Sequence, residues 1–543
     1  MRETTSGEET AIRWCDAVIR WGLVALIAFT PLAFGTVEAW SIAVMEWGVA
    51  SLLLVAVARR ILVGPAPEGT RWTTGVEWPL GLFLGLVLLQ LVPLPRPLVA
   101  VLAPGSASAH ASALAAPENG VTTRVDFEAL RAALSLGPPP DRVPVSLDRE
   151  ETAHRTGLLL TFASVFYLVA GWGATKGRAQ FLLRAIVIVG FCVALFSIVQ
   201  RLTWNGKIYW LRPSPQATAT GPFVNHNHFA GYVEMILPLA IALAYFMVDR
   251  QRHLPRPGED PPPAEGSRPT DSGLMDDGQE RANRWGRWLL AIFAAILILA
   301  SLVLSGSRGG LLSAVLSSGL LFAALWKRIR PRVLAWGVVV ALPLLAALLI
   351  AWIGLDALRA SIPQGSLERE ASFHARQVIW REVVDHLPEA GALGFGLGTF
   401  EASFAPYTPP GTAARWDKAH NDFLQIAWET GVVGGLLISW GALLFGIRYV
   451  YAALRSPAQD TDLFRVAIAV GLTSLVLHSM VDFNLQIGSN GFLFAVLAGL
   501  LVALHRSARA QSLAEIGPGP RLIDRSEDRI VAVPPGRQQE PVS

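Results

Sequence analysis

Long apolar stretches alternate with short polar segments along most of the chain. A helix that crosses the hydrocarbon core of a membrane needs about 20 mostly apolar residues. Candidate helices lie near residues 17–35, 40–58, 78–95, 154–173, 181–203, 228–248, 287–305, 309–326, 333–353, 421–446, 463–482 and 491–506. The pattern predicts an all-α fold: a polytopic integral membrane protein with about 12 transmembrane helices.

The distribution of Lys and Arg predicts the orientation of these helices. One set of connecting segments is basic, and the opposite short segments 36–39 and 483–490 carry no Lys or Arg. Basic loops stay in the cytosol, so both termini are expected there and the number of spans is even. Three segments then face outward, namely 96–153, 204–227 and 354–420.

The same pattern divides the chain into four parts. Residues 1–248 hold the first six helices and the outward loop 96–153, and 287–506 hold the other six with a large helical outward loop, 354–420. The segments between and after them, 249–286 and 507–543, are rich in Pro, Gly and charged residues. Such composition is typical of disorder, and we expect a cytosolic linker and a cytosolic tail.

Composition excludes two broad classes. The chain has 543 residues, of which 52% are hydrophobic and only 16% are charged, and its mean hydropathy is +0.43. Soluble proteins carry about 25% charged residues, so a water-soluble enzyme is excluded. The net charge is +3 and the cations are dispersed, which gives no indication of nucleic-acid binding.

The first candidate for chemistry is the turn Ser305–Gly310. Arg308 lies there at the membrane surface, on the side where positive charge is disfavoured, and the amides of Gly309 and Gly310 open the next helix. An arginine beside a helix N-terminus is a natural anion site. The alternative is a short turn whose arginine extends to lipid headgroups.

The outward loop 354–420 supplies the second and third candidates. Ser372–Arg381 is predicted to begin an amphipathic helix that carries Arg376, Trp380 and Arg381, with Phe373, Ile379 and Val383 on a shared apolar face. A helix lying on the membrane would explain Trp380 better than Arg376. The run Gly394–Phe400 favours an irregular turn with positive φ over a phosphate cradle, because no strand–turn–helix context surrounds it.

Two histidine-containing segments follow the same outward face. His420 precedes a span and is a candidate general base, because a histidine ring can accept a proton near neutral pH. Asn421 or Asp422 is expected to cap the following helix. Asn225, His226 and His228 lack the further ligands of a zinc site, and hydrogen bonding to a sugar or to the neighbouring loop is the favoured interpretation. Glu234 lies in the following span, and Asp482 and Asn484 can join the same polar layer.

Together these segments resemble the O-antigen ligase/polymerase superfamily of bacterial membrane glycosyltransferases, which use polyprenyl-diphosphate-linked glycans. The resemblance covers roughly residues 220–490. It is carried by the ordered motifs Ser307–Gly310, Arg376-x-x-x-Trp380, Gly394–Phe400, His420–Gln425 and Glu429-x-Gly431, with Asn225–Phe229 and Val481–Asn484 beside them.

The resemblance implies an enzyme of the bacterial inner membrane whose active site faces the periplasm. Its donor would be a glycan on undecaprenyl diphosphate, and its acceptor a hydroxyl of lipid A-core or of another glycan, without metal, cofactor or nucleotide sugar. Arg308 and Arg376 would stabilise the diphosphate leaving group, and His420 would accept the acceptor's proton. The predicted catalytic residues are therefore His420, Arg376 and Arg308, and the predicted substrate-binding residues are Arg308, Arg376, Arg381, Asn421, Asp422, Asn225, His226 and His228.

Other functions remain open at this level. A polymerase of O-antigen or exopolysaccharide shares the donor chemistry and differs only in its acceptor. A polysaccharide or lipid transporter also has about 12 spans, but it would place its charges near the bilayer midplane, whereas the candidates here lie at the outward edge. A scaffold would need neither the arginines nor the histidine. The loop 96–153, with Arg124, Arg131, Arg142 and Arg149, either contributes acceptor specificity or has no role in the site.

Overall fold

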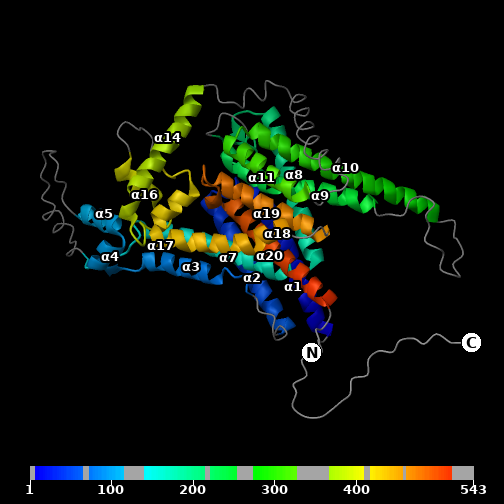
Figure 1. The fold of residues 1–543 in the computed structure, drawn as a ribbon, viewed down its shortest axis with the longest axis horizontal. Coiled ribbons are helices and arrows are strands. Elements are labelled where there is room, and N and C mark those ends of the chain that lie inside the picture. Colours follow the sequence, from blue (N-terminus) through cyan, green and yellow to red (C-terminus); the bar gives the residue numbers. More distant parts are fainter. Residues whose placement is uncertain are drawn as a thin grey trace, which may run out of the picture.

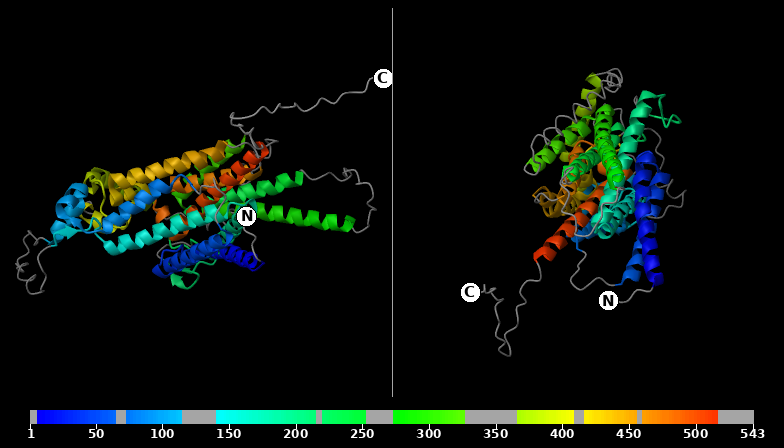
Figure 2. Two further views of the ribbon diagram at one scale, coloured as in Figure 1. Left: turned by 90° about the horizontal axis from the view of Figure 1, so that it is seen from below. Right: turned by 90° about the vertical axis from the view of Figure 1, so that its right-hand side faces the viewer.

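The computed structural model describes residues 6–64, 73–114, 140–214, 220–252, 273–326, 366–408, 416–455 and 460–516. Long helices pack side by side, and a cluster of short elements caps one end of them (Figure 1). Figure 2 shows that α3, α7 and α17 run together along the length of the molecule, in agreement with their contacts. The only strands among the described residues form two antiparallel pairs, and each strand has two residues.

The elements follow in chain order. The first half comprises α1 Ser6–Leu32, α2 Ala39–Val63, α3 Glu77–Leu91, β1 Leu94–Pro95, α4 Arg96–Leu102, α5 Pro104–Leu114, β2 Arg142–Val143, α7 Arg149–Trp172, α8 Lys176–Leu202, β3 Lys207–Ile208, β4 Arg212–Pro213 and α9 His226–Arg252. The second half comprises α10 Gly273–Ser305, α11 Arg308–Trp326, α14 Ser366–Asp385, α15 Leu387–Ala390, α16 Phe400–Phe404, η1 Ala405–Tyr407, α17 Asp422–Phe445, η2 Gly446–Tyr451, α18 Ala452–Arg455, α19 Asp460–His478, η3 Asn484–Gln486 and α20 Gly488–Ile516.

The helices confirm an all-α polytopic membrane protein. Eight described helices are long and apolar enough to cross a membrane: α1, α2, α7, α8, α9, α10, α17 with its continuation to Arg455, and α20. Three shorter apolar helices, α3, α11 and α19, match further predicted spans. The predicted span 333–353 lies outside the described residues, so the count of twelve stays a prediction.

Several helices extend beyond the apolar stretches that predicted them. The linker and tail predicted to be disordered are partly helical, because α9 continues to Arg252, α10 begins at Gly273 and α20 continues to Ile516. Hydropathy marks where a chain leaves the hydrocarbon, whereas an existing helix gains one more hydrogen bond for each residue added. The rest of both segments, 253–272 and 517–543, lies outside the described residues.

Helix α9 lies at the centre of the bundle. It packs against α10, α19, α8 and α11, and its Tyr232, Met235 and Ile236 are fully buried. Helices nearer the edge expose large apolar side chains instead, such as Trp47 on α2 and Leu436 on α17. This arrangement suits a protein surrounded by lipid, in which apolar side chains cover the outer surface.

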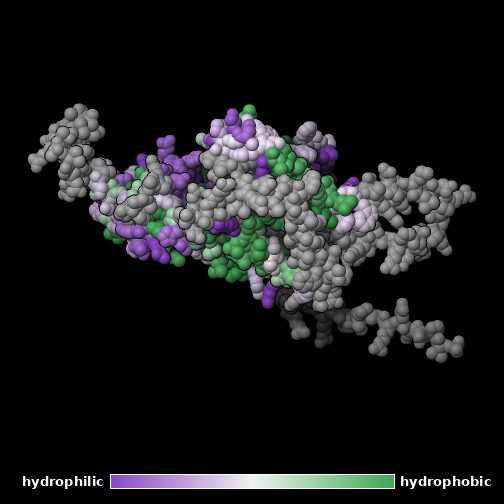
Figure 3. Space-filling view, turned by 90° about the horizontal axis from the view of Figure 1, so that it is seen from above, coloured by the Kyte–Doolittle hydropathy of each residue, from purple (hydrophilic) through white to green (hydrophobic). Residues whose placement is uncertain are grey.

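The polar subdomain, which we define as residues 94–114, 140–148 and 366–408, forms the cap at one end. Figure 1 shows α4, α5, α14 and α16 together there, and Figure 3 shows hydrophilic side chains gathered over the same end and a hydrophobic surface beside it. The Leu102 carbonyl accepts hydrogen bonds from the amides of Ala392 and Leu393, and the Leu147 amide donates to the Phe395 carbonyl. The described parts of the two loops treated separately in the sequence, 96–153 and 354–420, therefore pack together as one unit.

Candidate functional site

The turn between α19 and α20 is where the predicted site residues meet. We call Ser479–Asn484 the Asp482 turn. The Asp482 side chain is 1% exposed, yet it faces groups from four parts of the chain. Its carboxylate accepts hydrogen bonds from the Phe483 amide at 2.9 Å and from Asn227 Nδ2 at 2.6 Å.

An arginine and a histidine approach the same carboxylate at longer range. Arg376 Nη1 lies 3.7 Å from Asp482 Oδ2, and His420 Nδ1 lies 3.4 Å from Oδ1. Burial alone would raise the pKa of the Asp482 carboxyl, but the interactions with His420, His228 and Arg376 hold it well below its usual range. The surroundings of Asp482 thus favour its ionised form, and the carboxylate lies between an arginine and a histidine.

Helix α14 reaches the site with two residues one turn apart. Arg376 Nη1 donates to the Val481 carbonyl at 2.7 Å, and Trp380 Nε1 donates to the Ala419 carbonyl at 2.8 Å. Side chains at positions i and i+4 share a face of a helix, which explains the Arg-x-x-x-Trp spacing. Trp380 therefore holds the backbone beside His420 instead of lying in lipid.

The predicted apolar face of α14 is correct in part. Ile379 and Val383 are fully buried, but Phe373 is 48% exposed and touches the site elements only through an edge-to-face contact with Trp380. The prediction for Phe373 was wrong because the N-terminal end of α14 projects beyond the packed part of the polar subdomain (Figure 1).

His420 occupies a strained position that its neighbours enforce. Its φ is +49°, in the left-handed region that non-glycine residues rarely adopt. The Asn421 side chain caps α17 by accepting from the amides of Phe423 and Leu424, as predicted. The Asp422 carboxylate accepts from the Leu485 amide and from Gln486 Nε2, both at 2.9 Å. The start of α17 is thereby fastened to the Asp482 turn.

The ring of His420 is oriented as a proton acceptor would be. It packs edge-to-face on Phe483, with centroids 5.0 Å apart, and Nδ1 faces Asp482. A proton on Nδ1 leaves Nε2 as the free acceptor. The 3.4 Å separation is long for a hydrogen bond, as is common for catalytic pairs before substrate binds.

Arg308 lies on a different element but next to the same turn. It begins α11 and is exposed, and within the described part of the chain no hydrogen bond or ion pair involves it. A Cβ on Gly309 would lie 3.1 Å from Val481 Cγ2, the residue whose carbonyl binds Arg376. The turn that carries Arg308 therefore packs against the residue whose carbonyl binds Arg376.

Glu429 and the glycine run hold the polar subdomain against α17. Gly394, Gly396 and Gly398 have φ of +74°, +110° and +86°, which confirms the predicted positive-φ turn. The Glu429 carboxylate accepts from the Gly398 amide at 2.7 Å and from Gln425 Nε2 at 2.8 Å. These contacts join the glycine run to α17, the helix that begins after His420.

Asn225, His226 and His228, at the start of α9, lie near the Asp482 turn. They differ in exposure and have different neighbours. Asn225 Oδ1 accepts from the Asn227 amide at 2.8 Å, which caps α9. His226 is partly exposed and interacts electrostatically with Asp482 and Arg376. His228 is 6% exposed and packs edge-to-face on Phe483 at 4.7 Å, a position that orders the turn.

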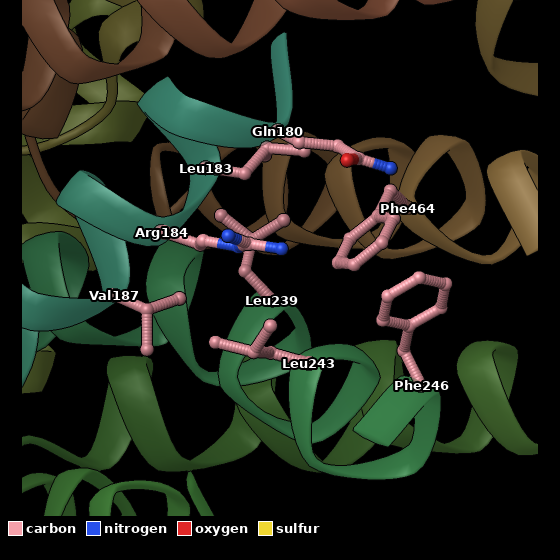
Figure 4. A pocket seen from close by; sticks show the side chains of 8 residues that line it. All are labelled: Gln180, Leu183, Arg184, Val187, Leu239, Leu243, Phe246 and Phe464. Atoms are coloured by element: carbon pink, nitrogen blue, oxygen red, sulfur yellow. The ribbon is translucent and has the colours of Figure 1, made fainter. Parts of the chain in front are cut away.

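One predicted binding residue is not brought to the Asp482 turn. Arg381 is exposed and lies five residues beyond Arg376, on a different face of α14. A small hollow between α8, α9 and α19 is also remote; it is lined by Arg184, Leu239 and Phe246 among others (Figure 4). Leu239 lies roughly 20 Å along α9 from His226 at 1.5 Å per residue, so this hollow belongs to the other end of the bundle.

Comparison with known families matches residues 293–439 to the O-antigen ligase family. The matched region contains Arg308, Arg376 and His420, each within its own sequence motif. This match over part of the chain supports the O-antigen ligase/polymerase superfamily. The expected resemblance is confirmed, and no curated protein matches the chain.

The O-antigen ligase region does not contain the whole site. Asp482 and Asn227 lie outside 293–439, yet Asn227 binds Asp482, and Asp482 contacts the ligase-region residues Arg376 and His420. The sequence placed Asp482 in a polar layer but did not select it as a site residue, and it missed His478 entirely. The sequence feature that could have indicated both residues is their spacing: His478 and Asp482 are four residues apart at the end of an apolar stretch.

Proposed function

We propose that this membrane protein transfers a glycan from undecaprenyl diphosphate to a hydroxyl group of lipid A-core or of another glycan, as O-antigen ligase-type enzymes do. One observation carries the proposal: Arg376 and His420 converge on the buried anion Asp482, while the Arg308 turn packs against the same segment. The match of residues 293–439 to the O-antigen ligase family supports the same class of reaction.

The reaction assigns one task to each group. The acceptor hydroxyl oxygen forms a bond to the anomeric carbon, the bond from that carbon to the diphosphate oxygen breaks, and the diphosphate leaves with the electron pair. Arg308 and Arg376 stabilise the charge that develops on the leaving group. His420 Nε2 accepts the hydroxyl proton, and Asp482 stabilises the imidazolium that results.

The arrangement favours transfer over transport. A transporter would keep its charged residues near the bilayer midplane, whereas Arg308, Arg376 and His420 lie at the ends of helices or in the polar subdomain. The basic segments at the other ends of the helices support a periplasmic location for the site and insertion in the inner membrane. Cysteine labelling of Gln377 from the periplasm, with labelling of Arg455 only after permeabilisation, is the expected result; the reverse pattern would contradict this orientation.

Reconstitution tests the proposed reaction. Purified full-length protein in proteoliposomes, given an undecaprenyl-diphosphate glycan and lipid A-core, should release undecaprenyl diphosphate and form an acceptor-linked glycan. Transbilayer movement of the donor without any new glycosidic bond would contradict the proposal. Product formed only when a second lipid-linked glycan replaces lipid A-core would indicate a polymerase.

A further inference from the structure

A buried acid–histidine pair lies directly behind the Arg308 turn and has no part in the chemistry described above. Glu234 Oε1 on α9 lies 3.2 Å from His478 Nδ1, at the end of α19. Both side chains are at most 1% exposed. Neither can touch a substrate in this arrangement.

The other edge of the His478 ring lies against the backbone of the Arg308 turn. A Cβ on Gly309 would lie only 2.8 Å from His478 Nε2, and one on Gly310 would lie 3.3 Å from His478 Cε1 and 2.7 Å from Ala230 Cβ. These glycines are therefore needed for close approach. The His478 ring therefore lies between the Glu234 carboxylate and the turn that carries Arg308.

The helices that carry Glu234 and His478, α9 and α19, also hold the Asp482 turn in place. The His478 carbonyl accepts from the Val481 amide at 3.0 Å, and so starts the turn that carries Asp482. On α9, Asn227 and Glu234 are seven residues apart and share a face; Asn227 binds Asp482 while Glu234 binds His478. One face of α9 thus fixes both the Asp482 turn and the Arg308 turn.

Burial of such a pair gains little stability in general, since apolar residues of similar volume often serve as well or better. Here Glu234 Oε2 also has no hydrogen-bond partner within the described residues. The Glu234–His478 pair is therefore better explained by the position it gives to neighbouring segments than by a gain in folding stability.

We propose that Glu234 and His478 are positioning residues that set the distance between Arg308 and Arg376, and thereby the fit of the donor diphosphate. The inference rests on the proposed function, in which these arginines bind that diphosphate. It adds two residues to the site that neither touch the substrate nor belong to the matched region 293–439.

Binding of undecaprenyl diphosphate, without any glycan, to the purified full-length protein in nanodiscs tests this proposal. Glu234→Ala should raise Kd about tenfold, within the range of coupling between residues that share contacts. Glu234→Gln keeps a hydrogen bond to the ring and should recover most of the affinity. Ser474→Ala, which removes a buried hydroxyl one turn earlier on α19, is the matched control and should bind as the wild type does.

A double-mutant cycle separates positioning from a general loss of structure. In an Arg308→Ala background, Glu234→Ala should cause little further loss, because the group that it positions is already absent. Additive losses, or wild-type affinity in Glu234→Ala, would overturn the inference. If Glu234→Ala does not fold, Gly309→Ala displaces the ring from its other edge, and wild-type affinity in that variant would overturn it equally. Wild-type affinity in Arg308→Ala would instead contradict the proposed function.

Discussion

Two aspartates in this molecule each face two basic side chains, and the difference between them separates a structural cluster from a site. Asp16 on α1 binds Arg59 Nε and Arg178 Nη2, both at 2.7 Å, and Trp172 Nε1 at 2.8 Å. Asp482 faces Arg376 at 3.7 Å and His420 at 3.4 Å.

At Asp16, both arginines form short ion pairs with the carboxylate. They fasten α1 to α2, α7 and α8 at one end of the bundle. At Asp482 the short hydrogen bonds come from neutral groups, Asn227 and the Phe483 amide, while the arginine and the histidine stay at longer range. A basic side chain that makes no short ion pair with the aspartate remains able to interact with a substrate.

The largest expected effect is at Arg376. Arg376→Ala should lower the rate of transfer by about 10³-fold, since loss of one group that stabilises developing charge typically costs 10²–10³-fold. Arg376→Lys should recover little, because an ammonium cannot bind a diphosphate in a bidentate way. Arg59→Ala is the matched control at Asp16 and should transfer normally per folded molecule. Equal losses in both alanine variants would remove the distinction between the two clusters.

Asp482→Asn should have the next largest effect. The amide retains one oxygen for the hydrogen bonds but removes the charge that stabilises a protonated His420, so the transfer rate should fall about 10²-fold. Rates are measured with saturating donor, alongside Asp16→Asn at the other cluster. A wild-type rate for Asp482→Asn would show that His420 acts without this anion.

Asp16→Ala should change stability and leave the chemistry intact. The variant would leave Arg59 and Arg178 without their shared partner, and we expect a loss of about 2 kcal/mol in the free energy of unfolding, between the values typical of exposed and buried pairs. Thermal unfolding in detergent measures the loss, and transfer per folded molecule measures the chemistry. A slower rate per folded molecule would contradict a purely structural role.

The smallest effect concerns Lys418, just before His420. Burial, followed by the charge of Arg155, lowers the pKa of the Lys418 amine. Between that lowered value and about 10.4 the unfolded chain binds more protons at this residue than the folded chain does, so its contribution to stability rises with pH. Lys418→Met should flatten the rise in unfolding temperature between pH 8.5 and 10, relative to Lys207→Met at the exposed hairpin. An unchanged rise would show that Lys418 is not the titrating group.

The fold was largely predictable because membrane helices are local features of a sequence. The apolar stretches identified eleven described helices, and the spacing of Arg376 and Trp380 and the glycines 394, 396 and 398 indicated a shared helix face and a positive-φ turn.

The site itself depends on contacts between distant residues. Asn227 and Asp482 are 255 residues apart, and Arg376 and Val481 are 105 apart. Nothing local at His478 shows that its ring lies behind Gly309. A single sequence therefore indicated Arg308, Arg376 and His420 through their motifs, but it did not reveal the residues that hold them together.

The central claim is that His420 accepts the proton while other groups bind the donor. Single-turnover transfer by His420→Ala, with donor affinity measured on the same preparation, tests it most directly. The account predicts a rate lower by about 10²–10⁴-fold, as general-base catalysis contributes, with donor Kd little changed. A wild-type rate, or a loss explained entirely by weaker donor binding, would contradict it.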